Sequence, residues 1–157
     1  MKIKLLAIGK TDNKQLAQLI EEYQSRLKHY IKFELEIIPD IKNVKNLSEA
    51  QQKEKEGNLL LSKLQPTDQL ILLDDKGKQY TSMEFSQYLQ KKMNSGIKQL
   101  VLVIGGPYGF SEAVYKKATG KLSLSKMTFS HQMIRLFIVE QIYRGFTILR
   151  NEPYHHE

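Results

Sequence analysis

The 157-residue sequence contains no cysteine. This absence excludes disulfide bonds, thiol nucleophiles and every metal site built on cysteine ligands, and it is typical of a reducing compartment. The four histidines, at positions 29, 131, 155 and 156, lack the spacing of a zinc-binding helix and have no companion set of serine and aspartate. We therefore expect no bound metal and neither a metallohydrolase nor a serine hydrolase.

Long hydrophobic runs are also absent. A membrane-spanning helix needs about 18 or more consecutive, predominantly apolar residues, and the sequence has no such stretch. The opening residues, MKIKLLAIGKTD, combine lysines with a short apolar run, but no small-residue cleavage site follows, so we reject a signal peptide and expect a cytoplasmic protein. The net charge of +7 suits a polyanionic partner such as RNA, although ordinary lysine-rich solubility explains it equally well.

Short apolar runs alternate with longer helical patterns along the chain. Repeated alternation of this kind predicts a single α/β domain over residues 1–157, with a largely parallel sheet flanked by helices. Strands are expected at 3–8, 33–38, 69–73, 100–104 and 121–124, with residues 74–77 forming a turn. Helices are expected at about 13–30, 48–64, 81–96 and 132–150, with a brief one after Ser111. Ser48 with Gln51, and Thr81 with Glu84, form capping-box patterns.

Ligands of parallel sheets bind beyond the carboxyl ends of strands, which selects the segments 73–75, 105–109 and 123–129. The glycine turn, residues 105–109 of IGGPYG, is neither a dinucleotide fingerprint nor a P-loop. Its glycines would let a flat ligand approach the backbone, or they simply make a tight strand-to-helix connection. Asp74 and Asp75 could act as an acid/base pair or hold a metal ion. We favour a third interpretation, in which they belong to a solvated turn.

The segment SLSKMTFSHQ, residues 123–132, is rich in hydroxyl groups and lies between an expected strand and a very apolar helix. Burying such a segment is costly unless its polar groups find partners, and a bound ligand would supply them. Helix initiation, with Thr128 or Ser130 as the N-cap, is an alternative role, and both roles can hold together.

Apolar residues cover most sides of the last expected helix. This apolar surface is wider than contact with a single core requires. A homodimer would bury the second side. On this helix, Glu140 and Arg144 have the spacing of an intrahelical ion pair, whereas Arg135 has no partner in the sequence and could face phosphate. The final residues, NEPYHHE, are either frayed or a lid that stacks on a base.

Three C-terminal segments, IGGPYG, LSLSKMTFSHQMIRLFIVEQIYRG and NEPYHHE, resemble the ribosomal RNA large subunit methyltransferase H family of the SPOUT superfamily. The resemblance covers essentially the whole chain, including MKIKLLAIGK and the EKEG at 54–57. It implies a SPOUT-type fold with a C-terminal trefoil knot, a cofactor-binding region at about 70–150, and a homodimer. It further implies the use of S-adenosylmethionine to methylate N3 of a pseudouridine in 23S ribosomal RNA on the assembled ribosome.

The same resemblance assigns roles to particular residues. Catalysis and substrate binding fall on Arg144, Tyr154 and His155, with His131 and Arg135 as weaker substrate contacts. Members of the family commonly have proline where this chain has Ser130. Cofactor contacts fall on the last residue of the third expected strand, one residue in the glycine turn and six in the hydroxyl-rich segment: Leu73, Gly105, Leu124, Ser125, Lys126, Met127, Thr128 and Phe129.

Two other classes of function share some of these features. A non-catalytic factor that binds ribosomes or RNA would have the same basic charge but would not bind S-adenosylmethionine. A methyltransferase acting on a different RNA would have the same cofactor site. A nucleotide-dependent reductase or phosphotransferase would need a phosphate-cradling loop, which the sequence lacks.

Overall fold

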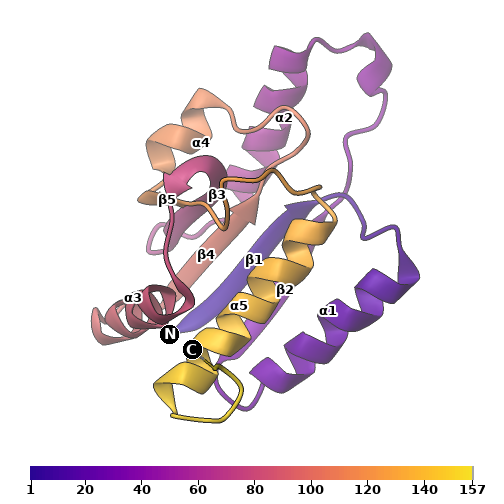
Figure 1. Cartoon of the computed structure of the whole chain (residues 1–157). Coiled ribbons are helices and arrows are strands. Elements are labelled where there is room, and N and C mark those ends of the chain that lie inside the picture. Colours follow the sequence, from indigo (N-terminus) through magenta and orange to yellow (C-terminus); the bar gives the residue numbers. More distant parts are fainter. Residues whose placement is uncertain (157) are drawn as a thin grey trace.

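A five-stranded parallel sheet forms the centre of the molecule in the computed structural model, which describes residues 1–156 (Figure 1). The strand order is β2-β1-β4-β3-β5, and every neighbouring pair is parallel. The strands are β1 (Lys2–Ile8), β2 (Lys32–Ile38), β3 (Gln69–Lys78), β4 (Gln99–Ile104) and β5 (Gly120–Leu122). This confirms the expected α/β class and parallel sheet.

Helices cover both faces of the sheet. Helices α1 (Lys14–Leu27), α3 (Ser82–Asn94) and α5 (Met133–Leu149) pack on one face, where α5 lies between α1 and α3 (Figure 1). Helices α2 (Glu49–Ser62) and α4 (Glu112–Lys117) pack on the other face, and a 3-10 turn, η1 (Val44–Asn46), precedes α2. Alternate residues of each strand point to opposite faces, so Leu5 enters the core under α5 and Leu6 the core under α2.

Side-chain caps fix where several helices begin. Ser48 and Gln51 form a complete capping box at α2, and Thr81 and Glu84 form another at α3, as the sequence predicts. Ser111 caps α4 through the Val114 N–H. These caps satisfy backbone N–H groups that the first helical turn leaves without partners. The helix boundaries accordingly lie close to those expected, although α1 ends at Leu27 rather than near residue 30.

The largest difference from the expected elements is the length of β3. The segment 74–77 was expected to be a turn, but β3 continues through it to Lys78. Both Leu73 and Lys78 pair with Leu122 of β5, so the intervening residues form an irregularity in a continuous strand. Gly77 permits this, because a Cβ atom there would lie 2.5 Å from the carbonyl carbon of Leu122. Strand β5 in turn ends at Leu122, two residues earlier than expected.

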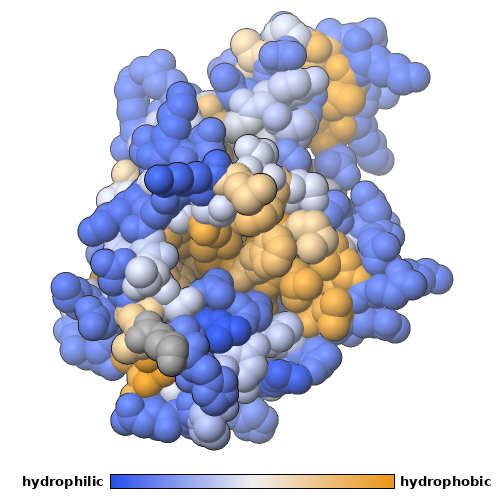
Figure 2. Space-filling model, viewed as in Figure 1, coloured by the Kyte–Doolittle hydropathy of each residue, from blue (hydrophilic) through white to orange (hydrophobic). Residues whose placement is uncertain are grey.

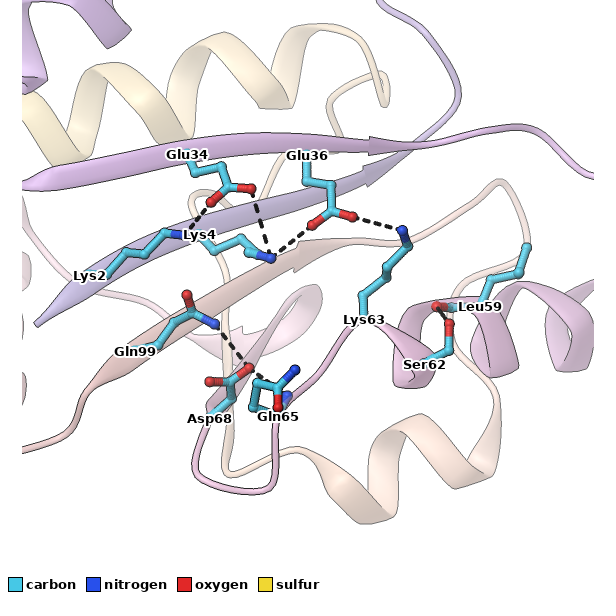
Figure 3. A network of polar contacts seen from close by, with 10 residues as sticks. All are labelled: Lys2, Lys4, Glu34, Glu36, Leu59, Ser62, Lys63, Gln65, Asp68 and Gln99. Carbon is cyan, nitrogen blue, oxygen red and sulfur yellow. Dashed lines mark hydrogen bonds and ion pairs between the residues drawn. The ribbon is translucent and has the colours of Figure 1, made fainter.

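A ladder of alternating charges joins β1 and β2 on the α2 side of the sheet (Figure 3). Lys4 Nζ lies 2.8 Å from Glu36 and 3.9 Å from Glu34, and Lys63, the residue after α2, reaches Glu36 at 2.9 Å. Lys2 pairs with Glu34 at the outer end of the ladder. Nearer the carboxyl ends of the two strands, the same face of the sheet carries the apolar core under α2 in place of charged side chains.

The strand order determines where a ligand can bind. Strands β4, β3 and β5 are neighbours, so residues 73–75 within β3 and the segments that follow β4 and β5 lie at one edge of the sheet. Within residues 1–156, none of the helices combines the length and hydrophobicity needed to cross a membrane.

Candidate functional site

A cavity of about 320 Å³ lies at this edge, beside residues 73–75 of β3 and beyond the carboxyl ends of β4 and β5. Its apolar wall is made by Ile104 of β4, Leu122 of β5 and Ile134 of α5. Phe110, the residue after the glycine turn, completes this wall. The glycine turn forms one side, where Gly105 and Gly106 present backbone rather than side chains. The segments that the sequence selected as three separate strand ends therefore surround a single cavity.

Two carboxylates, Asp74 and Asp75, lie among the residues that line this cavity. The Tyr115 hydroxyl donates to Asp74 Oδ2 at 2.6 Å, and the Lys76 N–H donates to Oδ1 at 2.8 Å. Burial alone would raise the pKa of Asp74, but these hydrogen bonds outweigh it and lower the pKa below its ordinary value. Burial, together with the bond to Asp74, raises the pKa of Tyr115 to about 12. Asp74 thus presents negative charge to the cavity at neutral pH.

The hydroxyl-rich segment holds its own shape through its serines. Ser123 Oγ donates to the Ser125 carbonyl at 2.8 Å, and Ser125 Oγ accepts from the Met127 N–H at 2.9 Å. Ser130 Oγ accepts from the Met133 N–H at 3.1 Å, so it binds a backbone N–H at the first residue of α5. The N-cap residue of α5 is Gln132, which makes no side-chain cap, so neither Thr128 nor Ser130 occupies the expected N-cap position.

Most of the predicted cofactor residues line the cavity. These are Leu73, Gly105, Leu124, Ser125, Met127, Thr128 and Phe129, and His131 lines it as well. Lys126 is exposed and is not among the lining residues. Met127 has 76% of its surface exposed, so it lies at the opening, whereas the Phe129 ring packs 4.7 Å from the Phe137 ring of α5.

Arg135 does not face solvent. Its side chain is 1% exposed and donates to the carbonyls of Ile8 and Gly9, both at 2.8 Å, and to Thr11 Oγ1 at 3.1 Å. A fourth bond, at 3.0 Å, goes to the His131 carbonyl. Arg135, for which the sequence indicates no partner, therefore has partners far away along the chain, and it ties the end of β1 to α5. A contact between Arg135 and RNA phosphate would require this cluster to open, and the function proposed below does not use one.

The three residues expected to act in catalysis lie together in a second cluster. Arg144 contacts Glu140 through Nη2 at 2.6 Å and Nε at 3.1 Å, which confirms the predicted ion pair, and its Nη1 lies 3.3 Å from His155 Nδ1. The Arg144 guanidinium carbon lies 4.7 Å from the centre of the Tyr154 ring. Tyr154 in turn donates to Glu140 at 2.9 Å and lies 3.1 Å from the Tyr23 hydroxyl of α1. The C-terminal residues up to His155 thus fold back onto α5 and α1.

Burial and the hydrogen bonds with Tyr23 and Glu140 raise the pKa of Tyr154 far above its ordinary value. The hydroxyl therefore stays protonated near neutral pH and acts as a hydrogen-bond donor. Burial alone would lower the pKa of Arg144, but the bond with Glu140 outweighs it and raises the pKa, so the guanidinium stays charged.

The two clusters lie apart within one chain. Ile134 lines the cavity from the first turn of α5, and Arg144 follows ten residues later, about 15 Å along the helix axis. Neither Arg144 nor Tyr154 nor His155 lines the cavity.

Sequence reasoning did not identify Tyr115 and Tyr23 as parts of these sites. Tyr115 has no signal in the sequence, because it reaches Asp74 only through the packing of α4 beside β3. Within residues 1–156, no group of three or more histidine, aspartate or glutamate side chains is arranged to hold a metal ion.

A family model described as "Predicted SPOUT methyltransferase" matches residues 1–155, nearly the whole chain. The fold and the cavity therefore belong to a methyltransferase of the SPOUT class.

Curated relatives make the family more specific. Proteins named "Ribosomal RNA large subunit methyltransferase H" are 75% identical in Flavobacterium johnsoniae, 70% in Parabacteroides distasonis and 58% in Porphyromonas gingivalis. Each alignment covers 157 residues and the full length of both chains. The chain belongs to the ribosomal RNA large subunit methyltransferase H family.

Proposed function

We propose that the protein transfers a methyl group from S-adenosylmethionine to N3 of a pseudouridine in 23S ribosomal RNA, acting on assembled ribosomes in the cytoplasm. The observation that carries the proposal is the cavity itself. Three strand ends, the glycine turn and the hydroxyl-rich segment surround one space, and seven of the eight residues expected to contact the cofactor line it. The names of the full-length relatives supply the RNA substrate.

The chemistry of the cavity fits this cofactor better than a nucleotide phosphate. The described residues that line the cavity include two aspartates and neither a lysine nor an arginine. The negative charge of Asp74 disfavours a polyphosphate there and favours a cationic sulfonium. The apolar wall and the exposed backbone of Gly105 and Gly106 suit a flat adenine ring.

The distance between the cavity and the Arg144 cluster supports a composite site in a homodimer. If both take part in one reaction, a second chain must bring its own tail to the cavity. Apolar side chains gather over α5 and beside it on the face shown in Figure 2. Met127, Met133 at 40% exposure and Leu19 at 45% exposure are large apolar residues open to a partner.

Each catalytic candidate has a role that its environment supports. The cofactor supplies an electrophilic methyl group, and positioning of the target nitrogen opposite it provides much of the acceleration. Tyr154, which keeps its proton, would donate a hydrogen bond and hold the base. Arg144, which stays charged, would stabilise the anion formed when N3 loses its proton or contact a phosphate. His155, beside Arg144, is the candidate to receive that proton.

The decisive test is methyl transfer to a defined nucleotide. Ribosomes from a strain lacking the enzyme are incubated with the protein and with S-adenosylmethionine labelled in its methyl group, and the label is mapped along the RNA. Label at one pseudouridine of 23S RNA supports the proposal. Label in another RNA would redefine the substrate, and saturable ribosome binding without label or cofactor binding would indicate a binding factor instead.

The composite site has its own test in mixed dimers. A Gly105→Val chain should lose cofactor binding, because even a Cβ at Gly105 would lie 3.1 Å from the Phe110 ring. A His155→Ala chain should keep it. If the site combines two chains, co-expressing these two inactive variants should restore part of the activity, and no restoration would place all functional groups in one chain. The trefoil knot belongs to the same proposal, and it rests on membership of the family.

A further inference from the structure

Helix α2 places an acidic side chain directly behind the glycine turn. Glu56 is 3% exposed, although its neighbours Glu54, Lys55 and Asn58 are exposed. Glu56 Oε1 accepts a hydrogen bond from Gln52 at 2.9 Å. Glu56 Oε2 is buried and has no hydrogen-bond partner among the described residues. A buried carboxylate oxygen without a donor is costly, so its position calls for a reason.

This carboxylate lies against the backbone of Gly106. A Cβ atom at Gly106 would lie 2.2 Å from Oε2 and 2.7 Å from the carboxyl carbon of Glu56. The next residue of α2, Gly57, is equally close to the end of the same loop, since a Cβ there would lie 2.3 Å from Ser111 Oγ. Helix α2 thus supports the turn from one side, while Gly106 lines the cavity on the other.

We propose that Glu56 is a positioning residue that sets the glycine turn in its cofactor-binding conformation. In this conformation the free oxygen Oε2 accepts a hydrogen bond from a main-chain N–H of residues 105–109. Glu56 is not one of the residues that line the cavity, so it acts through the turn and not by touching the cofactor. The inference rests on the proposed function in one respect, the identity of the ligand as S-adenosylmethionine.

The arrangement requires two acceptor oxygens, which a carboxylate has and an amide lacks. Glutamine at position 56 would keep the size of the side chain but replace one acceptor with an NH₂ group. That group would face either the Gln52 amide or the turn. In the ligand-free protein the substitution removes a buried charge whose second oxygen has no partner, so stability should be unchanged or higher. In the cofactor complex it removes a charge-assisted hydrogen bond.

The test compares the affinity for S-adenosylmethionine, measured by calorimetry, with ligand-free stability, measured by urea unfolding. Glu56→Gln should weaken binding by about tenfold or more while leaving the unfolding midpoint unchanged or raised. Glu54→Gln removes an exposed carboxylate from the same helix and should change neither quantity. Unchanged affinity in Glu56→Gln would overturn the inference, as would a loss of affinity accompanied by a comparable loss of stability.

A second pair of variants tests the contact itself. Gly106→Ala forces a methyl group against the carboxylate and should weaken cofactor binding, whereas the double variant Gly106→Ala/Glu56→Ala removes the clash and should bind better than Gly106→Ala alone. Additive losses in the double variant would contradict the proposed contact. If the unsubstituted chain shows no saturable binding of S-adenosylmethionine, the proposed function fails, and this inference fails with it.

Discussion

Replacing Arg135 with methionine should strongly destabilise the protein, because the guanidinium holds together segments far apart in the sequence. The side chain is 1% exposed and bonds to the carbonyls of Ile8 and Gly9 across as many as 127 residues. Methionine fills similar space but donates no hydrogen bond. The two carbonyls would then lose their charged donor in a region that the arginine now shields from water.

The magnitude follows from these contacts. Hydrogen bonds to a charged group contribute about 1.5–3 kcal/mol each, and a buried acceptor left unsatisfied costs about 1–3 kcal/mol. Burial lowers the pKa of Arg135, which reflects a cost of holding its charge away from water that methionine would remove. The balance is a loss of roughly 2–4 kcal/mol in the free energy of unfolding.

Urea unfolding followed by circular dichroism measures this loss, with Arg150→Met as the matched control. Arg150 is exposed at the other end of α5, where it stacks 4.4 Å from the Tyr30 ring, so its replacement should cost less than about 1 kcal/mol. A loss below about 1 kcal/mol for Arg135→Met would refute the assigned anchoring role. A normal stability with a weaker salt dependence of ribosome binding would instead indicate a phosphate contact.

Three further predictions concern charge and catalysis. Asp74→Asn should weaken the binding of S-adenosylmethionine roughly tenfold, or 1.4 kcal/mol, since it removes negative charge beside the cavity; unchanged affinity in calorimetry would exclude this role. Lys4→Met should lower the free energy of unfolding by about 1–3 kcal/mol at pH 7, measured by urea titration. Hydrogen bonds from Lys4 and then Lys63 hold the pKa of Glu36 in the folded protein below its ordinary value of 4.5. The stabilisation that this carboxylate provides is therefore complete at pH values above its unfolded pKa. It is lost as the pH falls through the lowered pKa of the folded protein. The Lys4→Met variant should therefore lose less stability than the unsubstituted protein between pH 6 and pH 3, and an equal loss would contradict the linkage. His155→Ala should reduce turnover while leaving cofactor affinity nearly intact, and unchanged turnover would remove His155 from the mechanism.

Local patterns predicted the elements and the position of the cavity well, because both depend on signals a few residues long. The apolar run at 100–104 became β4, and the Ser48 and Thr81 capping boxes mark the starts of α2 and α3. The cavity followed from one general rule: parallel strands end at a common edge, so segments that follow neighbouring strands meet there.

Features that depend on long-range packing were not predictable from those patterns. The bond between Arg135 and Gly9 spans 126 residues, and nothing near either residue announces it. The burial of Glu56 also depends on long-range packing. Helix α2 has several acidic and basic side chains, and only the packing of the helix beside Gly106 determines that Glu56 is the buried one. The continuation of β3 through residues 74–77 likewise depends on β5 approaching Gly77, so a sequence typical of a turn forms part of a strand.

The packing of helix α5 supports the proposal that two chains form each complete site. Its inner residues Ile138, Ile142 and Gly145 are buried, and a Cβ at Gly145 would lie 2.9 Å from Leu89 of α3. A helix held this closely against the sheet and α3 cannot bend to bring Arg144 to the cavity that begins at its first turn. In the homodimer proposed above, a tail from another copy would bridge the distance of about 15 Å. Because such a pairing is reciprocal under two-fold symmetry, each proposed dimer would contain two complete sites, each with the cavity of one chain and the Tyr154 and His155 of the other.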